Sequence, residues 1–108
     1  MSVLLNLGNG NFAAPVVSGT GINPVSITAL DVNEDGKPDL VTANYGGGSV
    51  SVLVNLCNGV FAPALDYAAG GVITSVAALD LNGDSRPDLA AASIGVDGVT
   101  VLFNTCLP

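Results

Sequence analysis

The feature that most constrains this chain is a repeat of 49 residues that runs without a gap. Residues 2–50 and 51–99 are identical at 22 of the 49 aligned positions, and the opening strand of a third copy follows in the stub at 100–108. Chains of this kind stack copies of one supersecondary unit, and each copy buries its apolar faces against its neighbours. We therefore describe the 108 residues as one repeat domain with two full repeats and a stub.

Each repeat consists of short β runs separated by turn residues. We expect strands at 25–30, 40–44, 49–55 and 61–68. Gly or Pro interrupts every candidate apolar period of 3.6 residues, so we expect no helix. Four antiparallel strands per repeat, with Pro63 in a fourth strand at the sheet edge, are typical of a propeller blade. The predicted fold class is all-β, with β-propeller blades of four antiparallel strands and about two blades per chain.

Almost all charged residues fall in two segments, 31–39 and 80–88, which hold seven of the nine acidic residues and both basic ones. Side-chain oxygens at positions 1, 3, 5 and 9 of a tight turn can enclose a hard cation such as Ca²⁺, which takes six to eight oxygen ligands. The alternative is a pair of polar β-turns in which Asp and Asn bond their own backbone. That alternative explains one or two acidic residues per loop, but not four oxygens at the same spacing in both copies.

Composition restricts the partners of the chain. Only 10% of the residues are charged, against about 25% in a usual soluble domain, so large apolar faces must be covered by other repeats or other copies. The net charge is −7 and the only basic residues are Lys37 and Arg86, which leaves no basic patch for nucleic acid. No apolar run reaches the roughly 18 residues of a membrane helix, so we expect no membrane insertion.

These features together resemble the FG-GAP repeat, also called the VCBS repeat, of integrin α-chain propellers, fungal propeller lectins and many bacterial secreted proteins. The resemblance covers the whole chain. The residues that carry it are the Asp-x-Asn-x-Asp-Gly-x-x-Asp loop at 31–39, the strand at 50–53, the Asn-Gly-x-Phe turns at 9–12 and 58–61, and the Phe-Ala-Ala-Pro and Phe-Ala-Pro segments at 12–15 and 61–63.

The resemblance implies that each acidic loop joins the first two strands of a blade and binds Ca²⁺. The implied ligands are side-chain oxygens together with the backbone carbonyls of Lys37 and Arg86. The side-chain ligands would be Asp31, Asn33, Asp35 and Asp39 in loop one, and Asp80, Asn82, Asp84 and Asp88 in loop two. An EF-hand is disfavoured, because Thr42 and Ala91 stand where its bidentate Glu would be.

The second loop departs from the first at one backbone position. Ser85 stands where loop one has Gly36, and left-handed geometry strains a residue with a side chain. We therefore rank the second site below the first. Gly83 offers a different place for the bend.

Two blades do not close a propeller, which has four to eight. We expect residues 2–18 to hold strands three and four of one blade, 22–68 a complete blade, and 72–104 strands one to three of another. Head-to-tail association of copies would complete the blades, and such an interface gives a ring when the rotation closes. The predicted partner is therefore the chain itself, in a cyclic trimer ahead of a tetramer. Strand three occurs at both ends, and the sequence leaves open which copy is displaced.

The functional class that we expect is a binding or scaffold module and not an enzyme. The chain has no His and no Gly-x-Ser-x-Gly motif, and outside the loops its carboxylates are Asp66 and Asp97. The resemblance raises a glycan or protein ligand. Tyr45 and Tyr67 could stack on a sugar, although covering a blade edge is the commoner role for such residues. The alternative is an architectural fragment of a longer surface-protein array.

The cysteines and the N-terminus say little about the compartment. Cys57 and Cys106 are 49 residues apart, and equivalent positions in neighbouring repeats are about 10 Å apart or more, beyond the reach of a disulfide. We expect two thiols, with an intermolecular bridge through Cys106 as the alternative. Met1 leads directly into a strand without a signal peptide, as expected for a piece of a longer protein, and the resemblance implies an extracellular or cell-surface location.

Overall fold

The structure is a computed structural model that describes residues 1–57, 60–94 and 98–104. The described ranges consist of strands joined by turns, bends and irregular segments, and they contain no helix. The predicted all-β class is confirmed. It also follows that no helix within these ranges is long and apolar enough to cross a membrane.

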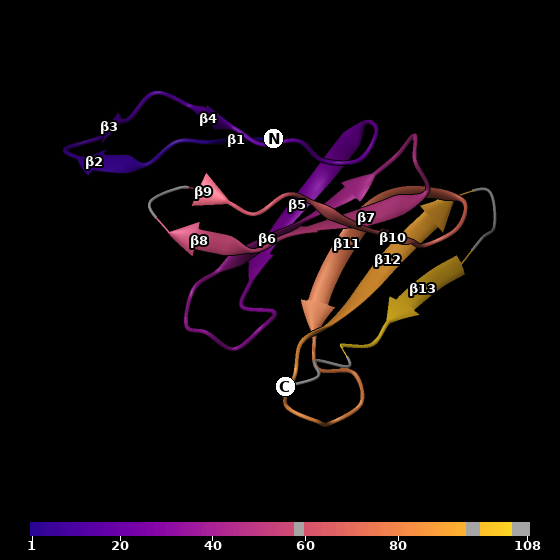
Figure 1. Cartoon of the computed structure of the whole chain (residues 1–108). Coiled ribbons are helices and arrows are strands. Elements are labelled where there is room, and N and C mark those ends of the chain that lie inside the picture. The colour runs from indigo at the N-terminus through magenta and orange to yellow at the C-terminus, as the bar shows by residue number, and fades with distance from the viewer. Residues whose placement is uncertain (58–59, 95–97, 105–108) are drawn as a thin grey trace.

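A four-stranded antiparallel sheet forms the centre of the molecule (Figure 1), with the strand order β10-β7-β6-β5. Its strands are β5 (Pro24–Leu30), β6 (Asp39–Asn44), β7 (Ser49–Leu53) and β10 (Leu65–Ala68). The strand predicted at 49–55 ends earlier, at Leu53, and the hairpin continues through β8 (Asn55–Cys57) and β9 (Val60–Phe61). The single strand predicted at 61–68 is wrong, because Pro63, which has no N–H to donate, lies between β9 and β10.

A three-stranded antiparallel sheet follows, with the order β11-β12-β13. Its strands are β11 (Val72–Leu79), β12 (Asp88–Ile94) and β13 (Gly98–Leu102). The register repeats that of the first sheet at a distance of 49 residues: Leu40 pairs with Leu53 in β6 and β7, and Leu89 pairs with Leu102 in β12 and β13. The second sheet therefore corresponds to the first three strands of the first sheet.

The first 18 residues form an extended hairpin that we call the N-terminal arm, and it projects away from the sheets (Figure 1). Its strands are β1 (Ser2–Val3), β2 (Asn6–Gly8), β3 (Asn11–Phe12) and β4 (Val16–Val17). Val3 pairs with Val16, just as Val52 pairs with Leu65 in the four-stranded sheet. The arm thus has the register of strands three and four, as the repeat predicts.

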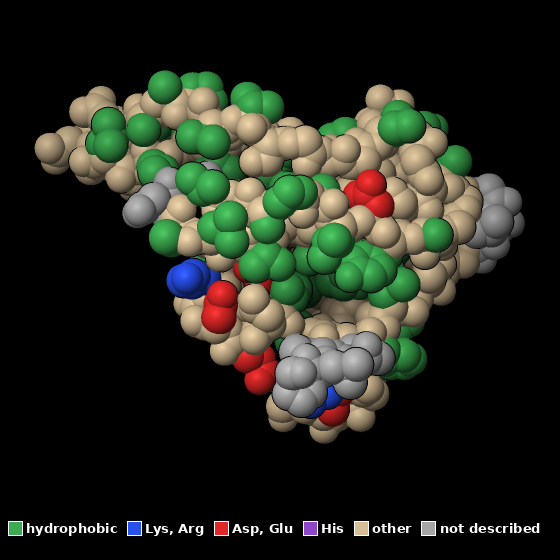
Figure 2. All heavy atoms as spheres, in the orientation of Figure 1, with side chains coloured by type: hydrophobic (Ala, Val, Ile, Leu, Met, Phe, Trp, Pro, Cys, Tyr) green, Lys and Arg blue, Asp and Glu red, His purple; other side chains and the backbone are tan. Residues whose placement is uncertain are grey.

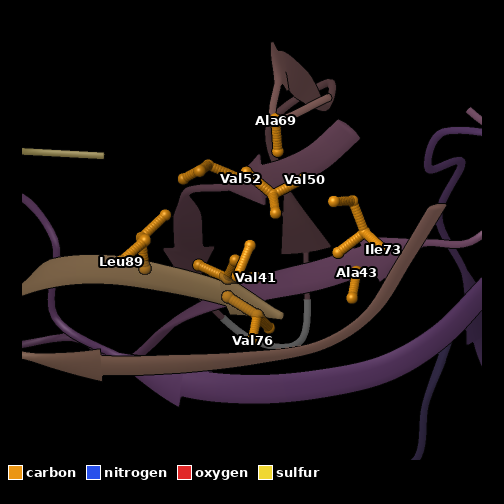
Figure 3. Close-up of a cluster of buried hydrophobic side chains, with 9 residues drawn as sticks. Val41, Ala43, Val50, Val52, Ala69, Ile73, Val76 and Leu89 are labelled. Atoms are coloured by element: carbon orange, nitrogen blue, oxygen red, sulfur yellow. The ribbon is translucent and has the colours of Figure 1, made fainter. Parts of the chain in front are cut away.

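The main core lies between the two sheets, where β11 packs against β5 and β6. The buried side chains are mostly Val and Ala, as expected where two β surfaces approach closely. In Figure 3, Val41 of one sheet and Val76 of the other lie side by side in this layer. The cluster consists of Val41, Ala43, Val50, Val52, Ala69, Ile73, Val76, Leu89 and Ala91.

The other face of the four-stranded sheet buries polar side chains. The hydroxyl of Thr42 donates to Oδ1 of Asn44 at 3.0 Å, and Nδ2 of Asn44 donates to Oγ of Ser51 at 2.8 Å. Oγ of Ser51 accepts a bond from the backbone N–H of Gly21 at 2.9 Å and donates to Asp66. These bonds satisfy groups that would be costly to bury alone, and they tie the segment before β5 to this face.

Candidate metal centres

Two acidic loops lie at the same edge of the two sheets, between β5 and β6 and between β11 and β12 (Figure 1). Figure 2 shows acidic and basic side chains gathered along this edge. Each loop follows an apolar strand and ends at a buried Asp that opens the next strand, Asp39 in the first sheet and Asp88 in the second. The fold therefore places the predicted side-chain ligands at two equivalent positions.

The first carboxylate of each loop accepts bonds from the backbone of the same loop. Oδ1 of Asp31 accepts from the N–H of Asp35 at 3.1 Å, and Oδ2 accepts from the N–H of Gly36 at 2.7 Å. Asp80 does the same in loop two, where its Oδ2 accepts from the N–H of Ser85 at 2.8 Å. These bonds curl the loop around the carboxylate, a common role of Asp in turns.

The middle residues of loop one lie close to the same carboxylate. Oδ1 of Asp35 accepts from the N–H of Lys37 at 2.9 Å. The side-chain amide of Asn33 lies 3.1 Å from Oδ1 of Asp31 and 3.1 Å from Oδ1 of Asp35, and with its nitrogen on this side it donates to both. With its oxygen turned to this side, three oxygens would face one another, an arrangement that a cation makes favourable.

In loop two, Asp84 repeats the backbone bond of Asp35, but Asn82 bonds differently from Asn33 and an ion pair is present. Oδ1 of Asp84 accepts from the N–H of Arg86 at 2.9 Å, and Oδ1 of Asn82 accepts from the N–H of Asp84 at 3.4 Å. Nη1 of Arg86 also lies 3.8 Å from Oδ2 of Asp84. This ion pair is exposed to solvent and contributes little stability.

The last carboxylate of each loop is fully buried and joins the loop to the residues that directly follow strand three. In the first sheet, Oδ2 of Asp39 accepts from the N–H of Val32 at 2.9 Å, and Oδ1 accepts from the N–H of Asn55 at 2.7 Å. In the second sheet, Asp88 accepts from the N–H of Leu81 at 2.9 Å and from the N–H of Asn104 at 2.8 Å. The sequence predicted these two residues as ligands and gave no sign that they also fasten the loop to the sheet.

The carboxylates of each loop form a cluster that fits a calcium ion. One oxygen from each Asp lies within 4.8 Å of the others. Because Ca²⁺ binds oxygens at 2.3–2.6 Å, two ligands of one ion lie at most about 5 Å apart. The clusters are Asp31, Asp35 and Asp39 in loop one, and Asp80, Asp84 and Asp88 in loop two. The backbone carbonyls of Lys37 and Arg86 stay predicted ligands.

The backbone of the two loops bends at the same two positions. Residues 34 and 36 have φ angles of 60° and 84° in loop one, and residues 83 and 85 have 79° and 68° in loop two. Each loop has one glycine and one other residue at these positions, so each contains one strained left-handed residue, Glu34 or Ser85. Gly83 therefore does not move the bend, and backbone strain does not rank the second site below the first.

The carboxylate of Asp80 lies among several backbone donors. The N–H of Ser85 is the main cause of a pKa below the ordinary value of 3.8, while desolvation opposes the shift and the N–H groups of Gly83, Asp84 and Asn82 add to it. Hydrogen bonds to the charged form stabilise it in this way. Asp80 is thus held in the anionic form that a metal ligand requires.

Two asparagines that sequence reasoning missed connect the loops to the sheets. Nδ2 of Asn55 donates to the carbonyl of Pro38 at 2.9 Å, and Nδ2 of Asn104 donates to the carbonyl of Val32, also at 2.9 Å. The second bond runs from the third copy of the opening strand to loop one. The signal was present, because each Asn stands 16 residues after the buried Asp that accepts its backbone N–H.

The other residues considered in the sequence lie away from the clusters. Asp66 lies on β10, and Tyr45 and Tyr67 are both exposed. Cys57 is an exposed free thiol. Cys106 and Asp97 lie outside the described residues.

A cleft of about 450 Å³ lies between residues 17–20, at the end of the N-terminal arm, and residues 61–66 around β9 and β10. Polar groups of Ser18, Thr20 and Asp66 line it together with the apolar side chains of Phe61 and Pro63. This mixture of apolar surface and a few polar groups is usual in binding clefts.

The comparisons with known proteins agree with the repeat seen in the sequence. The family model described as the FG-GAP-like repeat matches residues 1–42 and 31–91. No curated protein and no solved structure matches the chain.

Proposed function

The chain belongs to the FG-GAP-like repeat family, and from this membership we propose that it is a calcium-stabilised β-propeller repeat module. It acts as a non-catalytic binding or scaffold unit, outside the cell or at the cell surface. The observation that carries the proposal is the pair of three-carboxylate clusters at equivalent positions of the two repeats. The alternative of plain polar β-turns does not explain why three carboxylates lie close together in both repeats.

Calcium would act on the stability of the fold. Three carboxylates within 4.8 Å repel one another, and a bound cation reverses the sign of that interaction. Because Asp39 and Asp88 also hold strand three, the ion would stiffen the attachment of each loop to its sheet. An ion that binds only the native state raises the free energy of unfolding, by about 2.7 kcal/mol at a hundred times its Kd.

Thermal melts with Ca²⁺ and with a chelator test this proposal. We expect a higher Tm in millimolar Ca²⁺, because extracellular modules bind Ca²⁺ with Kd values of about 10⁻⁴–10⁻³ M. The variant Asp35→Asn removes one carboxylate from loop one, and Asp84→Asn does the same in loop two. Each should lose part of the calcium response. Superimposed melts of the parent protein with Ca²⁺ and with chelator would contradict the proposal.

A ring of copies is the second part of the proposal, and the exposure of equivalent residues supports it. Val50 is 0% exposed in the four-stranded sheet, while its equivalent in the second sheet, Val99, is 67% exposed. Conversely, Val76 of the second sheet is 7% exposed, while its equivalent in the first sheet, Ile27, is 52% exposed. At these two positions the side chain is covered where the two sheets meet and exposed on the outer face.

These two outer faces are the two ends of a stack of blades. Val99 and Val101 are the equivalents of Val50 and Val52, which pack against the second sheet within the chain. Ile27 is the equivalent of Val76, which packs against the first sheet. A second copy can therefore cover each face by repeating the contact already present. Such a heterologous contact closes into a ring when the rotation allows it. We favour three chains with six blades over four chains with eight.

A ligand of the ring would be a glycan or a protein, and the cleft that includes Asp66 is the candidate site for it. A carboxylate, two hydroxyls and apolar surface could recognise a sugar by hydrogen bonds and ring packing. A glycan screen with and without Ca²⁺ tests this, with Asp66→Asn as the site variant. Binding that Asp66→Asn abolishes supports a lectin-like role. No binding favours the alternative, an architectural unit of a longer surface array.

A further inference from the structure

Three segments of the chain have the sequence and the register of the third strand of a blade. Residues 2–6 read Ser-Val-Leu-Leu-Asn, residues 51–55 read Ser-Val-Leu-Val-Asn, and residues 100–104 read Thr-Val-Leu-Phe-Asn. The middle segment starts in β7 of the complete sheet. The first belongs to the N-terminal arm and the last to β13 and its continuation. A blade shared between two copies has room for only one of the outer two.

The C-terminal segment is anchored to the body of the molecule. It forms five residue pairs with β12, and Leu102 packs against the main core. The hydroxyl of Thr100 donates to the carbonyl of Ala69 at 2.8 Å. The backbone N–H of Asn104 donates to the buried Asp88 at 2.8 Å, and the side chain of Asn104 reaches loop one. Removing this segment would break contacts to both sheets and to both loops.

The N-terminal segment has a far weaker attachment. β1 forms two residue pairs with β4. Further backbone bonds join Leu5 to Ala13, Met1 to Ser18 and β2 to β3, and they too lie within the arm. Leu4, Leu5 and Leu7 are exposed. A two-stranded hairpin without further cover is marginally stable in water. β1 can therefore leave β4 at a small cost in free energy.

The outer edge of β13 has no partner strand among the residues that the structure describes. In the four-stranded sheet, β7 pairs on one side with β6 and on the other side with β10. In the second sheet, β13 pairs with β12 and is the last strand of the described sheet. The strand of the repeat that matches β10 is β4, because Val16 and Val17 are the equivalents of Leu65 and Asp66.

We propose that β4 of a second copy of this chain leaves its own β1 and pairs with β13, so that residues 2–8 are the displaced third strand. The proposal rests on the proposed ring and specifies its joint. The register follows that of β7 and β10, which pair Val52 with Leu65. Val101 of one copy therefore pairs with Val16 of the next copy. When β4 exchanges its partner β1 for β13 of another copy, one set of backbone hydrogen bonds is replaced by an equivalent set. In addition, the second copy covers the outer face of the second sheet.

Engineered disulfides in the full chain test this joint against its alternative. The background carries Cys57→Ser and Cys106→Ser. The pair Val16→Cys with Val101→Cys reports β4 of one copy on β13 of another. The pair Val3→Cys with Ala90→Cys reports the alternative, in which the whole arm displaces β13 and places β1 on β12. Paired residues of antiparallel strands have Cα atoms about 4.5–5.5 Å apart, which suits a disulfide.

We expect the pair at 16 and 101 to link chains to one another on oxidation, and the pair at 3 and 90 to stay unlinked. The matched control is Val3→Cys with Val16→Cys, which locks the arm in the register of the structure. The lock should reduce the native mass to that of a monomer until the disulfide is reduced.

The opposite result, with linkage at 3 and 90, would overturn the proposed joint. An assembled protein that forms neither link, or that keeps its mass when the arm is locked, would also overturn the joint while leaving the ring intact. A folded parent chain with the mass of a monomer would overturn the ring itself. The failure of the joint and the failure of the ring are thus distinguishable.

Discussion

At the scale of single residues, Asp39 and Asp88 have two roles, as members of a carboxylate cluster and as acceptors of backbone hydrogen bonds. The spacing of acidic residues in the sequence predicts only the first role. Each is a member of a carboxylate cluster, and each accepts two backbone bonds from segments that are far apart in the chain. The other cluster members are bonded mainly within their loops. Substitutions within one loop should therefore separate metal binding from folding.

The comparison of Asp39→Ala with Asp35→Ala tests this separation. Asp39→Ala leaves the part-buried N–H groups of Val32 and Asn55 without their acceptor, and an unpaired donor costs about 1–3 kcal/mol when it is buried. We expect the free energy of unfolding in chelator to fall by about 2–4 kcal/mol. The exposed Asp35→Ala should change it by less than about 1 kcal/mol while losing calcium response. Equal losses in urea melts of the two variants would show that Asp39 has no special structural role.

Exchanging the left-handed residues of the two loops should change the free energy of unfolding in opposite directions. Ser85 has a φ of 68°, and its equivalent Gly36 has a φ of 84°. Ser85→Gly should raise the free energy of unfolding by about 1 kcal/mol, because glycine avoids the clash of the side chain. Gly36→Ser should lower it by a similar amount. Chemical denaturation in chelator measures both, and changes of the same sign would contradict the backbone account.

Acid should weaken the fold through Asp80. The unfolded chain binds a proton on this group near its ordinary pKa of 3.8, and the folded chain does so at a lower pH. Between these values the unfolded state holds more protons, so stability rises with pH. The contribution of Asp80 is therefore present above pH 3.8 and is lost as the pH falls through the folded pKa. Urea midpoints in chelator should fall less steeply with acid in Asp80→Asn, and parallel curves would refute this.

At the scale of elements, the repeat predicted the sheets because their register follows the 49-residue period. The second sheet and the arm reproduce strand pairs of the first sheet at that offset. The period does not predict where a strand stops, and Pro63 divides the strand expected at 61–68. Nor does it predict the buried polar face with Thr42 and Asn44, since polar residues in a strand usually mark a face in water.

For the candidate metal sites, the sequence predicted the side chains that lie together but not the bonds that hold the loops to the sheets. Side-chain oxygens at a fixed spacing predicted which residues converge in each loop. The bonds from Asn55 and Asn104 were not predicted, because they depend on strand three lying beside the loop. The equal backbone strain of the two loops could be recognised only from the φ angles of the structure. In the sequence, Gly36 in loop one and Ser85 in loop two suggested that only loop two is strained.

The outer faces of the sheets give a prediction about association. Val99 is exposed on the face that the second copy would cover, so Val99→Lys should prevent assembly. Its effect on the folding of one chain should stay within about 0.5 kcal/mol, as is usual for surface substitutions. Leu7→Lys is the control, because Leu7 and its equivalent Leu56 are both exposed and lie in β2 and β8, outside the two main sheets. Native masses that both variants leave unchanged would argue against stacking through this face.

At the scale of the whole molecule, the acidic loops and the exposed outer faces of the sheets lie at different places. The loops lie at one edge of the sheets, where the proposed calcium ions would stabilise each sheet, while the outer faces and the edge of β13 would form the proposed contacts between copies. The bond from Asn104 to Asp88 joins the residues after β13 to the second loop, so the proposed ion would also help to hold β13 in the position that a second copy requires. Removing calcium should therefore weaken the ring as well as the single chain.

The native mass of the calcium-loaded protein, measured by light scattering, tests this account most directly. We expect a single discrete species of three chains, or of four if the ring holds eight blades, and a shift to smaller mass in chelator. Circular dichroism of the same sample checks that the chain is folded. A well-folded protein with the mass of one chain in saturating Ca²⁺ would contradict the account.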